Sequence, residues 1–472
     1  VEKKVGLFVT KELSSAIETC RAKVERIAHE CRAKNQKFRD QEFDLEDDAS
    51  LCLGNEEDKW GMSLRDVQRV TEIYEEPIFF PSGGAIDSNA IAQGDIGTCY
   101  FLAALATVAS IPGLIEKICV SRDEEVGVYG FIFYTNNGWE SIIIDDLLYT
   151  RIPKFEELDE SAKKIYHEDK EAYEAVARKG GRLLLFARSG SQQETWVPLI
   201  EKAYAKLNNN FAHLEGGFTT ESVEELTGGV SSVFKCQDIL NVDKFWNEEL
   251  LLVNKDRVFA GAFRGLQAPE DSPWERSPTV QGLYGNHAYS VLRAVECKGK
   301  RFVIVRNPWG TGEWTGPWSD GSKEWTPEWL AILPELGHRF GDDGQFVMEY
   351  KDFLRSFQYI DRTFLFDDRW ILASSWQDVP LSLEPCASSY GSLSFSVKIP
   401  SKTMTILALT RLNERAYRSL KKVARVRLEF AVVKQGDTAP LRTAVEVMSF
   451  TSRTLSIEME LDAGAYVVYV SM

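Results

Sequence analysis

The sequence predicts an α+β fold in which a long region of mixed helices and strands is followed by a final all-β region. Three observations support this prediction. The apolar stretch Tyr100 to Ala109 has the composition of a buried helix. Residues Ala288 to Val295 and Arg301 to Arg306 show the pattern of two strands, and Lys298 to Lys300 between them fit a hairpin turn. Within the final hundred residues, apolar residues alternate along three stretches, 393–399, 424–432 and 455–461, which is typical of an all-β sandwich.

Composition and charge exclude several classes of protein. The chain has 472 residues, with 55 Lys and Arg against 71 Asp and Glu, so its formal charge is −16. An acidic surface repels phosphates, so nucleic acid is not expected as a main partner. The longest apolar run, Tyr100 to Ile115, is shorter than the roughly 20 residues that cross a bilayer. Because Pro112-Gly113 also interrupts this run, we expect no transmembrane segment.

The cysteines and the N-terminal residues indicate a compartment. The eight cysteines have no CxxC motif and no regular spacing, so they do not form a disulfide framework. The first residues lack the apolar core of a signal peptide. We therefore expect a reducing compartment and a cytoplasmic location.

An amphipathic helix is predicted at the start of the chain, from Thr10, whose side chain would cap it, to about Asp40. Its apolar residues are spaced three or four apart: Leu13, Ile17, Cys20, Val24, Ile27 and Cys31. The stretch Gln41 to Asp58 is acidic and turn-rich, which predicts an extended connector rather than a core element.

The pattern is mixed from Val67 to Asp361. Strands are expected at Gly130 to Tyr134 and at Ser141 to Ile144, and a second helix at Trp196 to Leu207. The charged stretch Lys154 to Lys179 has no apolar face. It predicts a surface insertion.

One cysteine stands where a nucleophile is usually prepared. Cys99 begins the apolar helix directly after Gly94 and Gly97, which allow a tight turn of the backbone. Unpaired N–H groups and the helix dipole at such a position favour the thiolate and lower the pKa of the thiol.

A histidine and an asparagine flank the predicted hairpin. His287 opens its first strand, and Asn307 ends its second strand before Pro308, which stops the ladder. Together with Cys99 they form a papain-type set: a thiol nucleophile, an imidazole acid and base, and an amide that orients the imidazole.

Four motifs in chain order resemble the calpain family of cysteine proteases. They are Gln93 to Ala106, Glu201 to Asn208, Gly285 to Ser290 and Arg306 to Gly310. The N-terminal helix is similar to that of fungal calpain-like proteins, and the sequence has no EF-hand loop pattern of the kind found in a penta-EF-hand domain.

The resemblance implies a papain-like two-lobed protease core followed by a β-sandwich. We expect an N-terminal helix and acidic connector at 1–58, a protease core at 59–361 and a calpain-type β-sandwich at 362–472. Within the core, the helical lobe would cover about 67–230 and the β lobe about 231–361.

The resemblance also implies roles for individual residues. Cys99 would attack the scissile carbonyl, and His287 would take and return the proton. Asn307 would hold the imidazole, and Trp309 would shield the bond between them unless it is only a core aromatic. The side chain of Gln93 and the backbone N–H of Cys99 would form the oxyanion hole.

Two positions differ from the family pattern. The family usually has Gly-Asp-Cys-Trp around the nucleophile, whereas this chain has Gly97-Thr98-Cys99-Tyr100. Thr98 could still cap the helix through its hydroxyl.

We expect an intracellular endopeptidase that takes extended segments of protein substrates, with a catalytically weak adaptor that binds protein partners as the alternative. A transglutaminase-type acyl transferase is disfavoured by the motifs outside the triad.

Two calcium sites are implied by the resemblance. Glu194 matches a ligand of the first site, but Ala90 stands where an acidic ligand is expected. The second site would use Glu313, Asp320 and Asp343. At this second site Gln345 replaces an expected glutamate. A solvated acidic loop is the alternative interpretation of these residues.

A basic cluster lies between Arg411 and Arg427. It could contact anionic lipid or dock on the acidic core, whereas a solvated loop is the simpler expectation because no apolar membrane face accompanies it.

Overall fold

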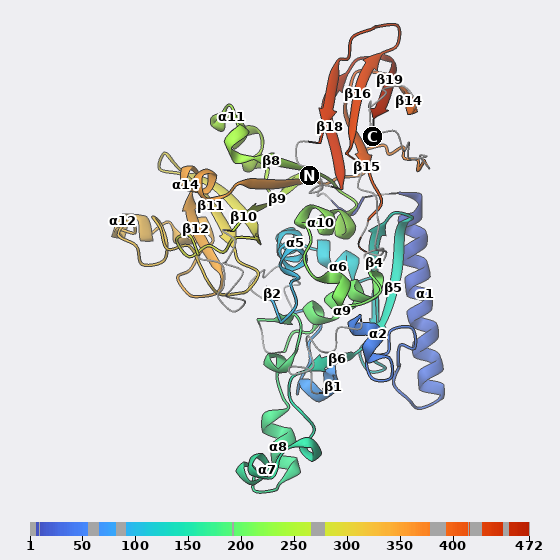
Figure 1. Ribbon diagram of the computed structural model, residues 1–472, viewed down its shortest axis with the longest axis vertical. Helices are drawn as coiled ribbons and strands as arrows, with labels where there is room; N and C mark the ends of the chain where they lie inside the picture. Colours follow the sequence, from blue (N-terminus) through green and yellow to red (C-terminus); the bar gives the residue numbers. More distant parts are fainter. Residues whose placement is uncertain are drawn as a thin grey trace, which may run out of the picture.

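The structure of the chain is a computed structural model, which Figure 1 shows as a ribbon diagram. The described residues are 6–8, 10–54, 66–81, 91–190, 193–265, 279–377, 393–413, 415, 427–446 and 453–471.

The helical lobe is built around a buried helix. Its helices are α2 (Ala49–Leu53), α4 (Val70–Ile73), α5 (Cys99–Ala109), α6 (Leu114–Ile118), α7 (Glu160–Ile165), α8 (Lys170–Ala177), α9 (Trp196–Leu207) and α10 (Thr219–Thr227). Its strands are β1 (Asp66–Arg69), β2 (Ile91–Ala92), β3 (Ser121–Asp123), β4 (Val128–Thr135), β5 (Gly138–Asp145), β6 (Leu147–Thr150) and β7 (Arg188–Ser189). Every residue of α5 after Cys99 is buried, so the predicted apolar helix is confirmed. Within the described residues no helix is long and apolar enough to span a membrane.

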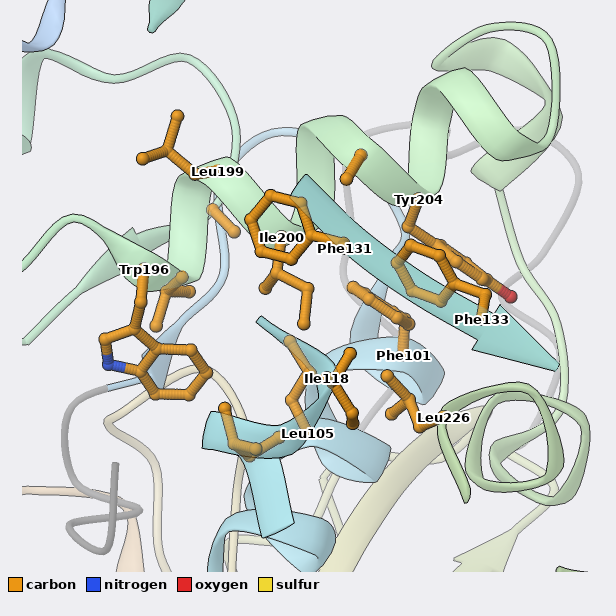
Figure 2. Close-up of a cluster of buried hydrophobic side chains, with 14 of the residues drawn as sticks. Phe101, Leu105, Ile118, Phe131, Phe133, Trp196, Leu199, Ile200, Tyr204 and Leu226 are labelled. Carbon is orange, nitrogen blue, oxygen red and sulfur yellow. The ribbon is translucent and has the colours of Figure 1, made fainter. Parts of the chain in front are cut away.

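Aromatic residues fix α5 in this lobe. The rings of Phe101 on α5 and Tyr204 on α9 are stacked with centroids 4.0 Å apart. Figure 2 shows that side chains of α5, α6, α9, α10 and β4 point into this cluster: Phe101, Leu105, Ile118, Phe131, Phe133, Trp196, Leu199, Ile200, Tyr204 and Leu226. The start of α5, and with it Cys99, is therefore held in place by dense packing.

The N-terminal helix α1 (Lys11–Ala33) lies along β4 and β5 (Figure 1). The predicted apolar face is buried, including Cys20 and Val24. The helix ends before Asp40, and the side chain of Thr10 does not cap it.

The prediction that Gln41 to Asp58 form an extended connector outside the core is wrong for the described residues, 41–54. Phe43, Leu45 and Leu53 are buried in the core of the helical lobe. The acidic side chains nearby are held by one cation, because the Arg39 guanidinium pairs with three of them: Asp44, Glu46 and Asp47. The apolar residues can therefore be buried within an acidic stretch.

The charged insertion is helical and projects from the lobe as α7 and α8 (Figure 1). It has a small aromatic cluster of its own, in which Phe155 and Tyr166 both contact Tyr173. Sequence periodicity missed this cluster because its members come from three short segments.

The β lobe is a six-stranded antiparallel sheet with the order β12-β11-β10-β9-β13-β8. Its strands are β8 (Val230–Lys235), β9 (Arg257–Phe263), β10 (His287–Cys297), β11 (Lys300–Arg306), β12 (Gln345–Glu349) and β13 (Tyr359–Phe364). Four helices accompany the sheet among the described residues: α11 (Val242–Glu248), α12 (Pro327–Leu330), α13 (Leu333–Leu336) and α14 (Tyr350–Ser356). The predicted hairpin is confirmed, because β10 and β11 pair and Lys298 and Gly299 both adopt positive φ between them.

The C-terminal region is β-rich. A four-stranded sheet of order β14-β19-β16-β17 faces the pair β15-β18 across a shared apolar cluster. Its strands are β14 (Leu393–Ile399), β15 (Thr403–Thr410), β16 (Glu429–Lys434), β17 (Arg442–Val445), β18 (Thr454–Leu461) and β19 (Gly464–Ser471).

Strand β18 contacts both lobes. The Thr454 hydroxyl donates to Glu224 of α10 at 3.0 Å, and the hydroxyls of Ser456 and Ser232 of β8 lie 2.9 Å apart. Glu458 pairs with Arg362 of β13. The C-terminal region is thus attached to the helical lobe and to the β lobe at once.

Substitution of Lys202 by Met tests the buried polar centre of the helical lobe. Lys202 and Asp145 are fully buried and paired, and Lys202 also donates to the Leu147 carbonyl at 2.9 Å. Removal of the cation leaves a buried carboxylate without its partner, so we expect a loss of about 3–5 kcal/mol in the free energy of unfolding. Urea denaturation measures it. Arg26→Gln, which breaks an exposed pair on α1, is the control and should change stability by less than about 0.5 kcal/mol. Equal effects of the two variants would contradict this assignment.

Candidate active site

Cys99 is the first residue of α5 and follows a turn that contains two closely packed glycines. A Cβ on Gly94 would lie 2.2 Å from the Phe186 carbonyl oxygen, and one on Gly97 would lie 2.7 Å from Glu215 Oε1. The backbone of Gly97 also accepts a hydrogen bond from the Gly216 N–H at 2.9 Å. The turn therefore packs closely against two other segments of the lobe.

The expectation that Thr98 caps α5 through its hydroxyl is wrong. The hydroxyl donates instead to Glu201 Oε1 at 2.7 Å, and the other oxygen of Glu201 accepts the Ala187 N–H at 2.7 Å. Burial raises the pKa of Glu201 to about 7. The Glu201 motif was recognised in the sequence, but its contact with Thr98 joins residues about a hundred positions apart and has no local signal.

His287 and Asn307 meet as predicted. His287 Nε2 lies 2.7 Å from Asn307 Oδ1. That oxygen also accepts the Trp309 N–H at 3.0 Å, while Asn307 Nδ2 donates to the Gly312 carbonyl at 2.9 Å. These two bonds assign the orientation of the amide, so His287 Nε2 must be the donor. The lone pair of the neutral ring therefore lies on Nδ1, the nitrogen left for a thiol.

Aromatic rings enclose the imidazole. The Trp309 ring centroid is 4.5 Å from that of His287, and Tyr289 packs edge-on at 5.0 Å. Asn307 is fully buried, and His287 is nearly so. This arrangement excludes water from the bond between His287 and Asn307.

The resting thiol and imidazole are both neutral. Burial raises the pKa of Cys99, whereas hydrogen bonds from the backbone N–H groups of Ala288 and Tyr100 act in the opposite direction. The expected lowering of the thiol pKa at the helix start is therefore wrong, because burial outweighs these bonds. Burial also lowers the pKa of His287 to about 4. The Cys99 thiol and the His287 ring, both described, do not hydrogen-bond to each other here; such contacts often tighten only when substrate binds.

Gln93 lies at the junction of the two lobes. Its backbone N–H donates to the Pro308 carbonyl of the β lobe at 3.2 Å, and its side-chain Nε2 donates to the Ile96 carbonyl at 2.7 Å. A carboxamide has two N–H groups, so one remains for a further acceptor. The amide thus lies in the turn before Cys99, where the sequence predicted an oxyanion donor.

The residues expected to bind calcium do not form a ready-made site. Glu313 Oε1 accepts the backbone N–H groups of Asp343 and Gly344, at 3.0 and 2.9 Å. Asp320 accepts from the His338 ring at 2.7 Å and from the Gly341 N–H at 2.8 Å. Donors thus already engage oxygens that a hard cation would need.

The remaining predicted ligand positions give the same result. Asp343 Oδ1 accepts the N–H of Gln345, whose side chain lies 3.2 Å from His338 Nδ1. Glu194 accepts the Trp196 indole N–H at 3.3 Å, and Ala90 lies outside the described residues. Across the ranges given above, no three His, Cys, Asp or Glu side chains are arranged to hold a metal ion. The described ones among the predicted ligands therefore form no preformed calcium site.

The basic cluster is only partly described. Arg411 pairs with Glu446 at 2.7 Å, Arg427 is exposed, and Arg415 is buried against the helical lobe. A solvated loop is therefore wrong for Arg415, which docks on the core. The other members, Arg418, Lys421, Lys422 and Arg425, lie outside the described residues.

Comparison with known proteins identifies the family. The model described as "Calpain family cysteine protease" matches residues 38–363, which is more than half of the chain. The chain belongs to the calpain family. The predicted fold class, a two-lobed calpain protease core followed by a β-rich region, is thereby confirmed.

Relatives from animals and plants are calpains. Calpain-9 of Mus musculus is 32% identical over 303 residues, which cover 62% of this chain and 38% of the relative. The calpain-type cysteine protease ADL1 of Oryza sativa subsp. japonica is 30% identical over 375 residues, covering 75% of this chain and 15% of the relative. The calpain-1 catalytic subunit of Gallus gallus is 29% identical over 362 residues, covering 74% and 45%. The chain thus spans less than half the length of these calpains.

The pH dependence of stability tests the environment of Glu201. Its pKa rises from 4.5 to about 7 on folding, so the folded state holds a proton that the unfolded state has lost. This group therefore lowers stability as pH rises from about 4.5 to 7, by about 3 kcal/mol in total. Glu201→Gln keeps an acceptor for the Ala187 N–H, while its NH2 group faces the Thr98 hydroxyl, which then accepts a hydrogen bond rather than donating one. The substitution removes the titration. We expect the variant to gain stability relative to wild type across this pH range in urea denaturation. A difference that does not change with pH would contradict the assignment.

Proposed function

We propose that this calpain-family chain is a cysteine endopeptidase that uses Cys99, His287 and Asn307. The observation that supports this most is the fixed orientation of His287. Asn307 holds Nε2 and leaves Nδ1 as the base, and the backbone N–H of the next residue on β10, Ala288, acts to lower the pKa of the Cys99 thiol.

The reaction follows from these positions. His287 Nδ1 takes the thiol proton as the Cys99 sulfur attacks the peptide carbonyl carbon. The oxyanion accepts hydrogen bonds from the Cys99 N–H, which has no partner inside the helix, and from the Gln93 amide. The imidazolium then gives its proton to the leaving amine, and a thioester remains on Cys99. Water, deprotonated by His287, hydrolyses the thioester and restores the thiol.

The neutral resting pair suits this sequence of steps. With the pKa of the thiol raised and that of the imidazole lowered, proton transfer from sulfur to nitrogen accompanies attack rather than preceding it. Closure around a substrate excludes water and strengthens the oxyanion contacts.

The proposal also covers substrate, location and calcium control. We propose extended segments of proteins as substrates and a reducing, intracellular compartment. The seven described cysteines are all free, in line with such a compartment. Calcium control rests on family membership alone, and assays in calcium and in chelator address it. No step above involves a metal.

Replacement of Cys99 by Ala tests the proposal. Removal of the nucleophile should lower hydrolysis of a denatured protein substrate at least about a thousandfold, as loss of a covalent nucleophile usually does. Cys31→Ala, which removes another free thiol on α1, is the matched control and should keep wild-type activity. Turnover is followed by release of labelled peptide.

The adaptor alternative gives the opposite outcome. A wild-type protein that hydrolyses nothing with or without calcium, and whose Cys99 does not react selectively with E-64, would contradict the peptidase proposal. The differences from the family pattern at Thr98 and Tyr100 would then explain the loss of activity.

A further inference from the structure

Arg415 comes from the C-terminal region but lies beside the nucleophile helix. Its side chain is only 2% exposed, and its guanidinium lies over the Tyr100 ring at 4.6 Å from the centroid. Tyr100 directly follows Cys99 in α5. A buried cation of the C-terminal region thus contacts the residue that follows Cys99 in the helical lobe.

The guanidinium makes several directed bonds in the helical lobe. Nη1 donates to the carbonyls of His213 at 3.1 Å and of Gly216 at 2.9 Å. Nη2 pairs with Glu221 of α10 at 3.2 Å. Only the planar fork of an arginine can reach these acceptors and stack on a ring at the same time.

The segment bound by Arg415 also holds the turn before Cys99. We call His213 to Gly217 the bracing segment. Its Gly216 N–H donates to the Gly97 carbonyl at 2.9 Å, and its Glu215 side chain accepts the Gly97 N–H at 3.3 Å. Arg415 therefore binds the bracing segment, and the bracing segment in turn binds Gly97 in the turn before Cys99.

Tyr100 packs closely against the bracing segment and hydrogen-bonds to it. The Tyr100 hydroxyl donates to the Leu214 carbonyl at 3.0 Å. A Cβ on Gly217 would lie 2.2 Å from Arg415 Nη2 and 2.7 Å from Tyr100 Cε2. The guanidinium also covers a ring that is smaller than the tryptophan expected at this position.

We propose that Arg415 is a positioning residue for Cys99, supplied by the C-terminal β-rich region. It holds the Tyr100 ring and the bracing segment, and these two fix the turn Gly97 to Cys99. This inference rests on the proposed function. It makes the C-terminal region part of the active site's support rather than a separate module.

The test compares Arg415→Ala with Glu458→Gln in the full chain. Glu458 lies on β18 and pairs with Arg362 of the β lobe, so its loss loosens the attachment of the same region at a different place. We expect Arg415→Ala to lower kcat by about 10- to 100-fold, because small misplacement of a reacting group costs this much. KM should stay within about twofold, since the residue does not touch substrate. Glu458→Gln should keep kcat.

Added ethylguanidinium gives a second readout. A small guanidinium that enters the vacated space should restore part of the kcat of Arg415→Ala and should not affect Glu458→Gln. If Arg415→Ala does not fold, Arg415→Lys replaces it; this variant keeps the charge but not the fork, so it should lose kcat as well. Unchanged kcat in the arginine variant, or an equal loss in Glu458→Gln, would overturn the proposal.

The reactivity of Cys99 separates this proposal from the proposed function. Iodoacetamide alkylation of Cys99 across pH, read by mass spectrometry, needs no turnover. A displaced Tyr100 N–H stabilises the thiolate less, so Arg415→Ala should raise the pH midpoint of alkylation by at least about half a unit. A wild type without hydrolysis would contradict the peptidase alone, whereas an unchanged midpoint would contradict the role of Arg415 alone.

Discussion

The contact of helix α5 with strand β10 is the interaction on which the site depends. Helix α5 belongs to the helical lobe and begins with Cys99, while β10 belongs to the β lobe and begins with His287. The Ser290 hydroxyl donates to the Ala103 carbonyl at 2.8 Å and fixes one element on the other. Because the aromatic core holds α5 and sheet pairing holds β10, Cys99 and His287 are placed by the two lobes rather than by a loop.

Burial at this contact has a chemical consequence. The packing that fixes Cys99 and His287 buries the imidazole and leaves the cysteine half-buried, and this desolvation raises the pKa of the thiol and lowers that of the imidazole. The thiol and the imidazole are therefore both neutral, and the function of the neutral imidazole depends on its tautomer, which Asn307 determines. It selects the tautomer with its lone pair on Nδ1, since Nε2 must donate to the amide oxygen. The C-terminal region adds a third constraint through Arg415 and strand β18, so each lobe and the β-rich region all contribute to one geometry.

The spacing of apolar residues and the turn residues predict many of the helices and strands. They do not predict contacts between residues far apart in the chain. The hairpin from His287 to Arg306 and the helix from Trp196 to Leu207 follow from periodicity and turn residues, which act over a few positions. Docking of the basic cluster on the core was one of the alternatives drawn from the sequence. The acceptors of Arg415 and the bond between Thr98 and Glu201 could not be predicted, because each contact joins residues far apart in the chain. The raised pKa of Cys99 was missed for a related reason, since the sequence shows the helix start but not the burial around it.

Cross-linking with 1,3-dibromoacetone tests most directly whether the two lobes bring the reacting groups together. This short reagent alkylates a thiol at one end and a ring nitrogen at the other, so it bridges only groups a few bonds apart. We expect peptide mapping to recover one intramolecular bridge between Cys99 and His287, with Asn307 unmodified. A bridge to another residue, or attachment to Cys99 alone at full modification, would contradict the arrangement of α5 and β10 from which the mechanism is derived.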